Sequence, residues 1–457
     1  MDESRFEQLE TLLRRRGIVT AAEIARELDV SQAGVSRLVA AAGERIVRIG
    51  KARASRYALA HPIARAGSRW PLYRIEARAR PEKLGELQAL HNDAFLFEPA
   101  RPLPAFLEGD FGSGLFPGLP WFLDDQRPQG FLGRAFGRRI AADIGARDDI
   151  VLWHSDDIVL GLLRHGEDQA GDLVLGEATL QRALRDIQEP RAVFPARQRA
   201  KAYPQLADIA LRGESIGSSA GGEQPKFTAT LRSDDGYKPV IVKFSDRVTT
   251  RAGRRWADLL ICEHLAGETL REHGLPAAIS DIVEADGRVF LESTRFDRTP
   301  ELGRRGFVSF AALDAGYYGH GRIDWWRFAS ELARDGWLNA DDAMLLRRLS
   351  WFGELIANSD MHLGNAALQL VDARPLPLAP AYDMLPMTFR PLPSGEVVER
   401  EYVVVQPLPE HREDWRIAAE AALAFWRDVA DETRISAGFR SIARDASAKL
   451  KATAARA

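Results

Sequence analysis

The sequence predicts an α+β fold divided into several domains, and three observations support this. The first sixty residues hold three short helical patterns followed by a β-hairpin pattern. An alternating strand pattern at 237–245 is followed closely by a long amphipathic helix pattern at 254–275, so strands and helices share one unit. A chain of 457 residues is also long enough for about three domain-sized units.

The composition indicates a globular protein of the cytoplasm. Apolar residues make up 46% and charged residues 28% of the chain, and no run approaches the roughly 20 apolar residues that span a bilayer. The first ten residues are acidic and amphipathic, unlike a secretory signal. Cys262 is the single cysteine, which excludes an internal disulfide. We therefore expect no membrane partner, and an inert, buried thiol in the helix around Cys262.

The charge is unevenly distributed. Residues 1–80 carry 16 lysines and arginines against 9 aspartates and glutamates, a net charge of +7, whereas the rest of the chain has a net charge of −10. A basic N-terminal region on an acidic body predicts that this region meets a polyanion.

The N-terminal region reads as a winged helix-turn-helix domain over residues 1–60. Helical patterns cover 4–17, 20–29 and 31–43, the second opened by the capping box of Thr20 and Glu23, and a basic hairpin pattern follows at 46–59. In such a domain the third helix reads the major groove of double-stranded DNA and the hairpin contacts its backbone. The candidate DNA-binding residues are Gln32, Ser36, Arg37, Lys51, Arg53 and Arg56. A protein-interaction module whose arginines face solvent is the alternative.

The next segment, 61–200, is predicted as an N-terminal α+β subdomain of the body, without assigned chemistry. The stretches 61–75 and 97–130 are rich in proline and glycine and are expected to be connectors and irregular loops.

Residues 201–300 are predicted to hold a nucleotide. "GESIGSSAGGEQPK" (213–226) places serines and glycines before Lys226, and glycine-rich backbone can form a nest of N–H groups for phosphate oxygens. It matches no standard phosphate-loop pattern, so a flexible hairpin loop is the alternative. Lys243 lies in the apolar strand that follows, where it can pair with phosphates and with Glu263 or Glu268 of the next helix; a lysine reaching solvent at a sheet edge is the other interpretation.

The last domain, 301–457, contains the densest polar cluster, "NSDMHLGN" (358–365). Asp360 precedes Asn365 by five positions, and Asp383 follows in "PAYDML". This is the spacing of a kinase catalytic loop, in which the aspartate takes the proton of the substrate hydroxyl and the asparagine binds Mg²⁺. The order of four features predicts phosphoryl transfer from ATP. They are a glycine-rich loop, a strand lysine, an aspartate loop and a further aspartate.

At this point the chain resembles the HipA-like serine/threonine kinases of bacterial toxin–antitoxin systems, in the branch that carries its own helix-turn-helix. The resemblance rests on "SAGGEQPK" (219–226), "VKF" (242–244), "NSDMHLGN" (358–365) and "PAYDML" (380–385), and covers roughly residues 100–440. It implies a two-lobed, protein-kinase-like body with a mostly helical C-terminal lobe.

The resemblance also implies roles for individual residues. Asp360 would be the general base and Lys243 would contact ATP phosphates, with Glu263 rather than Glu268 as its partner. Asn365 and Asp383 would bind Mg²⁺. The remaining nucleotide-binding candidates are Ser219, Ala220, Gly221, Gly222, Lys226 and His362. For His362 the alternative is a structural role as a hydrogen-bonded residue of the loop. Ser219 would be the autophosphorylated residue that silences the enzyme, with Ser218 close enough to compete.

Two departures from other kinases bear on control. The metal motif Tyr382-Asp383-Met384 lacks the glycine of a D-F-G segment, and Ser359 stands where an H-R-D loop has arginine. Regulation of the kinase through phosphorylation of Ser219 is consistent with both departures.

The resulting prediction is an ATP- and Mg²⁺-dependent protein kinase toxin that phosphorylates a protein, with a translation-related target as the family's example. Its fused DNA-binding head would let it act without a separate antitoxin, and the oligomeric state stays open. Two alternatives are a transcription regulator with a catalytically silent kinase-like sensor, and a small-molecule phosphotransferase.

Overall fold

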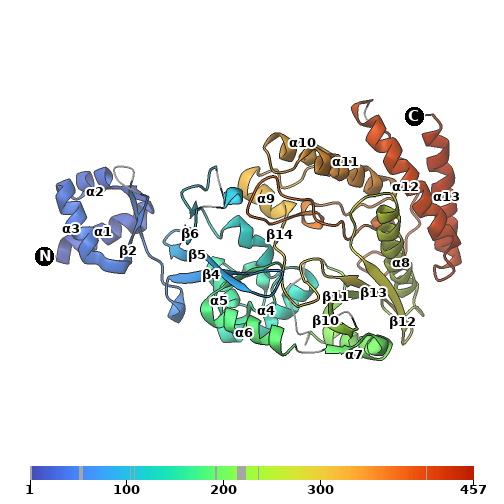
Figure 1. Ribbon diagram of the computed structural model, residues 1–457, viewed down its shortest axis with the longest axis horizontal. Coiled ribbons are helices and arrows are strands. Elements are labelled where there is room, and N and C mark those ends of the chain that lie inside the picture. Colours follow the sequence, from blue (N-terminus) through green and yellow to red (C-terminus); the bar gives the residue numbers. More distant parts are fainter. Residues whose placement is uncertain are drawn as a thin grey trace.

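The computed structural model describes residues 3–50, 55–102, 104–107, 109–190, 193–213, 223–234, 236–407 and 409–456. It is an α+β structure, as predicted. In Figure 1 the N-terminal head projects from one end of the body and the last two helices lie at the other end.

The head contains the three helices and the hairpin that the sequence predicts. They are α1 (Glu3–Arg16), α2 (Ala21–Glu27), α3 (Gln32–Ala42), β1 (Val19–Thr20), β2 (Ile46–Ile49) and β3 (Arg56–Leu59). The strands form an antiparallel sheet in the order β1-β3-β2. The capping box is also present, since the Glu23 backbone N–H donates to the Thr20 hydroxyl at 3.2 Å and the Thr20 N–H donates to the Glu23 carboxylate at 2.7 Å.

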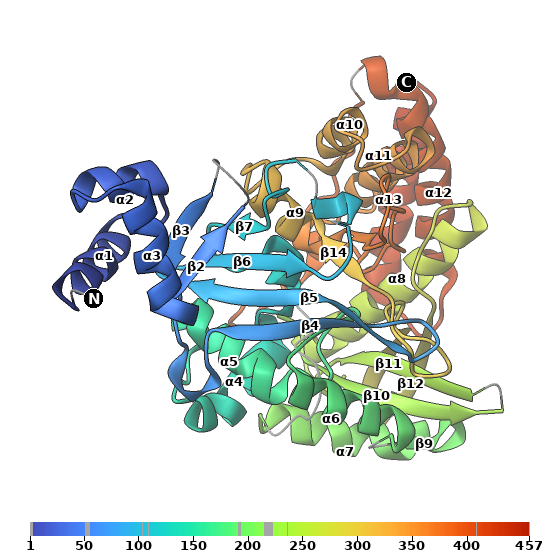
Figure 2. The same ribbon diagram turned by 60° about the vertical axis from the view of Figure 1, so that its left-hand side comes forward.

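A five-stranded sheet follows the head. Its strands are β4 (Arg69–Ile75), β5 (Pro81–Leu90), β6 (Ala94–Pro99), β7 (Leu115–Phe116) and β8 (Leu173–Leu175), and the helices of this part are α4 (Gly130–Ile144), α5 (Ser155–His165) and α6 (Glu177–Gln188). Figure 2 shows β4, β5 and β6 side by side, in the antiparallel order β7-β6-β5-β4-β8.

The expectation that 61–75 is a connector was wrong, because 69–75 forms β4. Its side chains alternate between burial and exposure, with Trp70 and Leu72 buried. Pro71 argues against an inner strand in a sequence reading, yet the sheet accepts it next to a register shift between Leu72 and Tyr73. Such shifts accompany β-bulges, which interrupt the regular pairing of a strand.

A second five-stranded sheet carries the predicted strand and helix. It consists of β9 (Val193–Pro195), β10 (Lys226–Ser233), β11 (Gly236–Phe244), β12 (Ser280–Ala285) and β13 (Arg288–Thr294), accompanied by α7 (Arg199–Leu211) and α8 (Arg251–Glu272). The order is β12-β13-β11-β10-β9, so β11 lies in the middle. Helix α8 begins a few residues before the expected position, because Thr250 caps it by accepting from the Gly253 N–H at 2.9 Å. Cys262 on α8 is free and fully buried, as expected.

The last part of the chain is mostly helical. It contains α9 (Phe310–Tyr317), α10 (Trp325–Arg334), α11 (Ala340–Leu355), α12 (Arg412–Asp431) and α13 (Ala437–Ala454), with the short strands β14 (Phe307–Ser309) and β15 (Ala367–Gln369) paired with each other. Within the described ranges no helix is long and apolar enough to cross a membrane.

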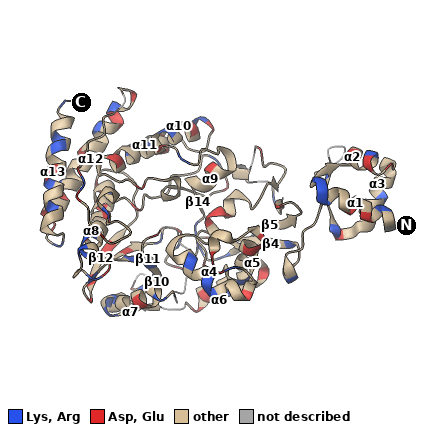
Figure 3. Cartoon of the chain, turned by 180° about the vertical axis from the view of Figure 1, so that it is seen from behind, with Lys and Arg blue, Asp and Glu red and all other residues tan. Residues whose placement is uncertain are grey.

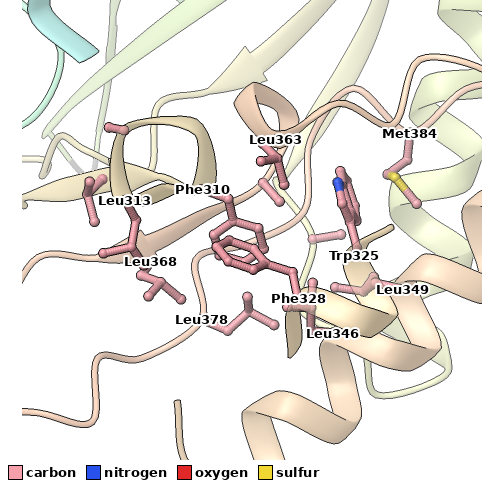
Figure 4. Packing of buried hydrophobic residues seen from close by; sticks show 14 of the residues in the cluster. Phe310, Leu313, Trp325, Phe328, Leu346, Leu349, Leu363, Leu368, Leu378 and Met384 are labelled. Carbon is pink, nitrogen blue, oxygen red and sulfur yellow. The ribbon is translucent and has the colours of Figure 1, made fainter. Parts of the chain in front are cut away.

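An apolar core lies directly beneath the polar segment 358–365. Figure 4 shows Leu363 and Met384 packed near Phe310, Trp325 and Phe328, all of which are buried. Burying each of these side chains contributes about 1.5–3 kcal/mol. The core therefore fixes the backbone on both sides of the polar loop and of Asp383.

The head is attached to the first sheet by contacts of its own. Val47 and Ile49 of the head form an apolar cluster with Leu90 and Leu96 of the body. The backbone continues the contact, since the His91 N–H donates to the Leu59 carbonyl at 2.9 Å. We call this the docking cluster; it is separate from the head's own core.

Candidate active site

Lys243 lies at the centre of the candidate site. It is the penultimate residue of the middle strand β11, and its neighbours Val242 and Phe244 are buried. Its ammonium group donates to Glu263 Oε1 on α8 at 2.6 Å and also contacts the carboxylate of Asp383. Glu268, the other candidate partner, is instead 3.5 Å from the ring of His264. Glu263, 20 residues after Lys243, and Asp383, 140 residues after it, thus meet at one lysine.

The electrostatics of this trio keep the lysine charged. Burial lowers the pKa of Lys243, but attraction by Asp383 and then Glu263 outweighs it, so the net shift is upward. Burial likewise raises the pKa of Asp383, and Lys243 followed by Lys226 reverses this and holds the carboxyl pKa below its ordinary value. Asp383 is therefore an anion at neutral pH, which suits a metal ligand.

Lys226 is a second buried cation beside Lys243. The two lysines face each other across the antiparallel pair β10–β11, and Lys226 is 3% exposed. Burial and then repulsion from Lys243, partly offset by Asp383, lower its pKa to about 8. Two adjacent lysines of this kind are able to bind phosphate oxygens.

Hydrogen bonds within the loop account for its polarity. The buried Asn358 accepts from the Asp360 N–H at 3.1 Å and donates to the Asp383 carbonyl at 3.3 Å. Asn365 donates through its amide nitrogen to the Asp360 carbonyl at 2.9 Å. His362 accepts from the Gly364 N–H at 3.0 Å and so caps the short helix η8 (Leu363–Asn365). The loop is thereby held closed and tied to the Asp383 segment.

Asp360 itself is half-buried, and within the described ranges its carboxylate has no hydrogen-bond or ion-pair partner. It is not among the residues that line the pocket described next. An unengaged carboxylate beside the pocket is available to accept a proton.

Asp383 adopts a left-handed backbone conformation, with φ of 55°. This is uncommon for a residue other than glycine, and such backbone clusters at functional sites. The neighbouring Tyr382 holds it in place, because its hydroxyl donates to the Gly364 carbonyl at 3.0 Å and its ring stacks on Phe296 at 5.8 Å.

A cavity of about 180 Å³ joins these groups, and we call it the central pocket. Of the predicted site residues, those that line it are Lys226, Lys243, Glu263, His362, Asn365 and Asp383. The predicted nucleotide-loop residues Ser219, Ala220, Gly221 and Gly222, and the serine Ser218, lie outside the described residues.

Several lining residues were missed by the sequence analysis. They include Asp125 and the segment 293–297 at the end of β13. Asp125 accepts from the Ser309 N–H at 2.6 Å, and burial raises its pKa to about 6. The sequence held no signal for Asp125, because it lies in a proline-rich stretch expected to be irregular and reaches the pocket only through tertiary packing.

The donor set fits a magnesium ion. The described residues contain no group of three histidine, cysteine or acidic side chains that could hold a metal. Mg²⁺ does not require one, since it is bound through one or two protein oxygens together with substrate phosphates and water. The Asn365 amide nitrogen is engaged with Asp360, which leaves its oxygen as the donor, and Asp383 supplies an ionised carboxylate.

The predicted DNA-binding residues are placed on the head. Gln32, Ser36 and Arg37 are exposed on α3, and Arg56 is half-buried on β3. Lys51 and Arg53 lie outside the described residues.

The basic character of the head is weaker than the count over residues 1–80 implied. Residues 1–60 carry 11 lysines and arginines against 8 acidic residues, so much of the excess comes from the body. Figure 3 shows acidic and basic segments on the head. Some of its arginines are paired, such as Arg16 with Glu27 at 2.7 Å.

Comparison with known proteins identifies the class. Residues 218–453 match the HipA-like C-terminal domain, and residues 66–184 match the middle domain of YjjJ-like toxins. The chain is 38% identical to Toxin YjjJ of Escherichia coli (strain K12) over 438 residues, which is 95% of this chain and 96% of that protein. The chain therefore belongs to the YjjJ-like toxins, which carry a HipA-like C-terminal domain.

One solved structure supports the fold. HipA in the Shewanella oneidensis MR-1 complex of HipA, HipB and operator DNA aligns with a TM-score of 0.53 at 14% identity, covering 84% of this chain and 97% of that chain. The Helicobacter pylori proinflammatory kinase CtkA aligns with a TM-score of 0.36 at 11% identity, over 52% of this chain and 92% of that chain, which is too low to compare folds.

Proposed function

We propose that this protein is a HipA-type toxin that acts as an ATP- and Mg²⁺-dependent protein serine/threonine kinase. The observation that carries the proposal is the meeting of Lys243, Glu263 and Asp383 at one pocket, beside Lys226 and Asn365. These are the groups that a phosphoryl-transfer site requires, and they come from three separate parts of the chain.

In this proposal the two buried lysines bind the phosphates of ATP. Lys243 is held by Glu263 and carries a full positive charge, so it can neutralise phosphate oxygens without a change of protonation. The segment containing Ser219, Ala220, Gly221 and Gly222 would cover the phosphates with backbone N–H groups.

Asp360 acts as the general base. Its carboxylate accepts the proton of a serine or threonine hydroxyl as the hydroxyl oxygen bonds to the γ-phosphorus of ATP and the bond from that phosphorus to the β-phosphate oxygen breaks, which releases ADP. The hydrogen bond that the Asp360 N–H donates to Asn358 and the one that its carbonyl accepts from Asn365 keep Asp360 in position for this step.

Asn365 and Asp383 are the residues that would hold Mg²⁺. When bound, the ion would neutralise charge on the β- and γ-phosphate oxygens. The Asp383 carboxylate would then interact with both the magnesium ion and Lys243.

The head is proposed to be a winged helix-turn-helix that binds double-stranded DNA through Gln32, Ser36 and Arg37. This is supported by the exposure of all three on α3 and by the three-helix and hairpin order. Because phosphate contacts release counterions, the affinity for a duplex should fall steeply with salt. An interaction with DNA that is insensitive to salt would contradict this part of the proposal.

Expression of the toxin in cells tests the kinase proposal. The wild type should arrest growth and the purified protein should convert ATP to ADP, whereas Asp360→Asn should do neither while remaining folded. If the protein is instead a transcription regulator with a catalytically silent sensor domain, Asp360→Asn should affect growth as the wild type does, because that effect would not require ATP turnover. Growth arrest by Asp360→Asn equal to that of the wild type would overturn the proposal.

A further inference from the structure

Part of the wall of the central pocket comes from the segment to which the sequence assigns no chemistry. Asp125, Gln129 and Ala170 line the pocket, and all three lie within residues 66–184, which match the middle domain of YjjJ-like toxins. The other lining residues lie between positions 226 and 383. The middle domain therefore contributes side chains to the pocket that is proposed to bind ATP.

Asp125 is held in a fixed position at this wall. It lies in the short helix η5 (Trp121–Gln126), whose apolar side chains are buried in the main core. The adjacent Gln126 is also buried and donates to the Leu173 carbonyl at 2.9 Å. The Asp125 carboxylate accepts from the Ser309 N–H through Oδ2 at 2.6 Å. Packing and hydrogen bonds on both sides thus fix the direction of this side chain.

One oxygen of this carboxylate is not engaged. Oδ1 of Asp125 has no hydrogen-bond partner among the residues that the structure describes, and it is not one of the buried polar atoms closed off from solvent. The neighbouring Asp124 differs in both respects, because it pairs with Arg127 and does not line the pocket. An accessible carboxylate oxygen in a pocket is an acceptor for a donor group of the ligand.

The charge of Asp125 restricts which part of a nucleotide it can meet. It repels the phosphates of ATP, which in the proposed function bind Lys226 and Lys243 of the second sheet. Burial raises the pKa of Asp125 to about 6, the bonds from Ser309 and the charge of Asp124 are the other influences, and neither lysine is among them. Asp125 therefore lies apart from the two lysines, where an uncharged part of the nucleotide would face it.

The uncharged part of ATP offers two kinds of hydrogen-bond donor, the hydroxyls of the ribose and the amino group of adenine. The adenine ring suits the apolar part of the wall, which includes Ile241, Ala278 and Phe296. The two ribose hydroxyls are neighbours, and a carboxylate has enough acceptor positions for both in addition to the Ser309 N–H. The ribose is therefore the better match for Asp125.

We propose that Asp125 binds the ribose of ATP by accepting hydrogen bonds from its 2′- and 3′-hydroxyls, so that the middle domain makes the site selective for ribonucleotides. A hydrogen bond to a charged acceptor is stronger than one between neutral groups, which gives this contact a measurable effect on affinity. The inference rests on the proposed use of ATP and adds the residue that recognises the sugar.

The test is isothermal titration calorimetry of the full chain with ADP and with 2′,3′-dideoxy-ADP, in the presence of Mg²⁺ at pH 8, where Asp125 is ionised. The wild type should bind ADP about tenfold more tightly than the dideoxy nucleotide. Asp125→Ala should bind the two with nearly equal affinity. Asp124→Asn is the matched control, since it removes the same charge from the adjacent position outside the pocket, and it should keep the tenfold preference.

A second variant, Asp125→Asn, decides where Asp125→Ala does not fold, as judged by circular dichroism. Its amide oxygen can accept from Ser309 and its NH₂ group cannot accept from a hydroxyl, so the preference for ADP should also fall. The inference is overturned if the wild type binds both nucleotides equally, if the Asp125 variants keep the tenfold preference, or if Asp124→Asn loses it. Failure to bind either nucleotide would overturn the use of ATP as well, so the two failures are distinguishable.

Discussion

The two residues on which the proposed chemistry depends differ in what they do for stability. Lys243 neutralises two largely buried carboxylates, whereas the Asp360 side chain has no partner among the described residues. A role in stability and a role in chemistry can therefore be separated by comparing the two.

Substitution of these residues should separate folding from activity. Lys243→Met removes the cation that bonds to Glu263 and Asp383 and leaves Lys226 as the nearby positive charge, so it should destabilise the protein by about 3–5 kcal/mol as well as abolish transfer. Asp360→Asn should abolish transfer with a stability change within about 0.5 kcal/mol. Chemical denaturation of both variants measures this, and a large loss of stability in Asp360→Asn would argue that its role is structural.

Asp125 should give the stability a dependence on pH. Its folded pKa is raised from 3.8 to about 6, so the folded protein binds this proton more tightly than the unfolded chain. The contribution is therefore fully present below pH 3.8 and is lost as the pH rises toward 6 and above, by at most about 3 kcal/mol. Asp125→Asn keeps an acceptor for Ser309 and should flatten the melting-temperature profile between pH 4 and 7. An unchanged profile would show that Asp125 titrates normally.

At the scale of elements, the site depends on two loops tied together by one asparagine. Asn358 joins the Asp360 loop to the Asp383 segment through two hydrogen bonds, and the core beneath fixes both. The sequence predicted the strand, the helix and the order of the motifs because local periodicity and spacing record them. It did not predict this link, since a side chain that bonds to backbone 25 residues away leaves no periodic pattern.

Removing that link should disturb both loops. Asn358→Ala leaves buried backbone groups without partners, which should cost about 1–3 kcal/mol of stability. Displacement of Asp360 should lower phosphate transfer about 100-fold. Ser359→Ala, at the exposed neighbouring position, is the control and should change neither. Full activity in Asn358→Ala, measured by ATP turnover, would show that the loop is positioned by its core alone.

At the scale of the whole molecule, the head is docked on the body rather than tethered by a free linker. The docking cluster joins β2 to the first sheet, and backbone hydrogen bonds join β3 to the same sheet. The sequence did not predict this contact, because it joins residues 47–60 to residues 90–96 through tertiary packing. It also did not predict β4, because Pro71 masks a strand that only the pairing with β5 and β8 makes evident. The orientation of the head is consequently fixed relative to the central pocket.

Disrupting the docking cluster should release the head intact. Ile49 belongs to this cluster and not to the head's own core, so Ile49→Asp places a charge in the interface at a cost of several kcal/mol while the three helices stay folded. The radius of gyration from small-angle X-ray scattering should rise, and trypsin should cut near Arg65. Arg48→Gln, at an exposed position of the same strand, should leave both unchanged. An unchanged radius for Ile49→Asp would mean that the backbone contacts suffice.

The central claim is that Lys243, Asp360 and Asp383 form one phosphoryl-transfer site, and the intact mass of the protein tests it most directly. The protein is first treated with phosphatase, which is then removed, and is incubated with Mg²⁺ and ATP. The wild type should gain the mass of phosphate, located by fragmentation to Ser219 or Ser218, and Asp360→Asn should gain none. An equal gain in Asp360→Asn, or no gain in the wild type, would contradict the account.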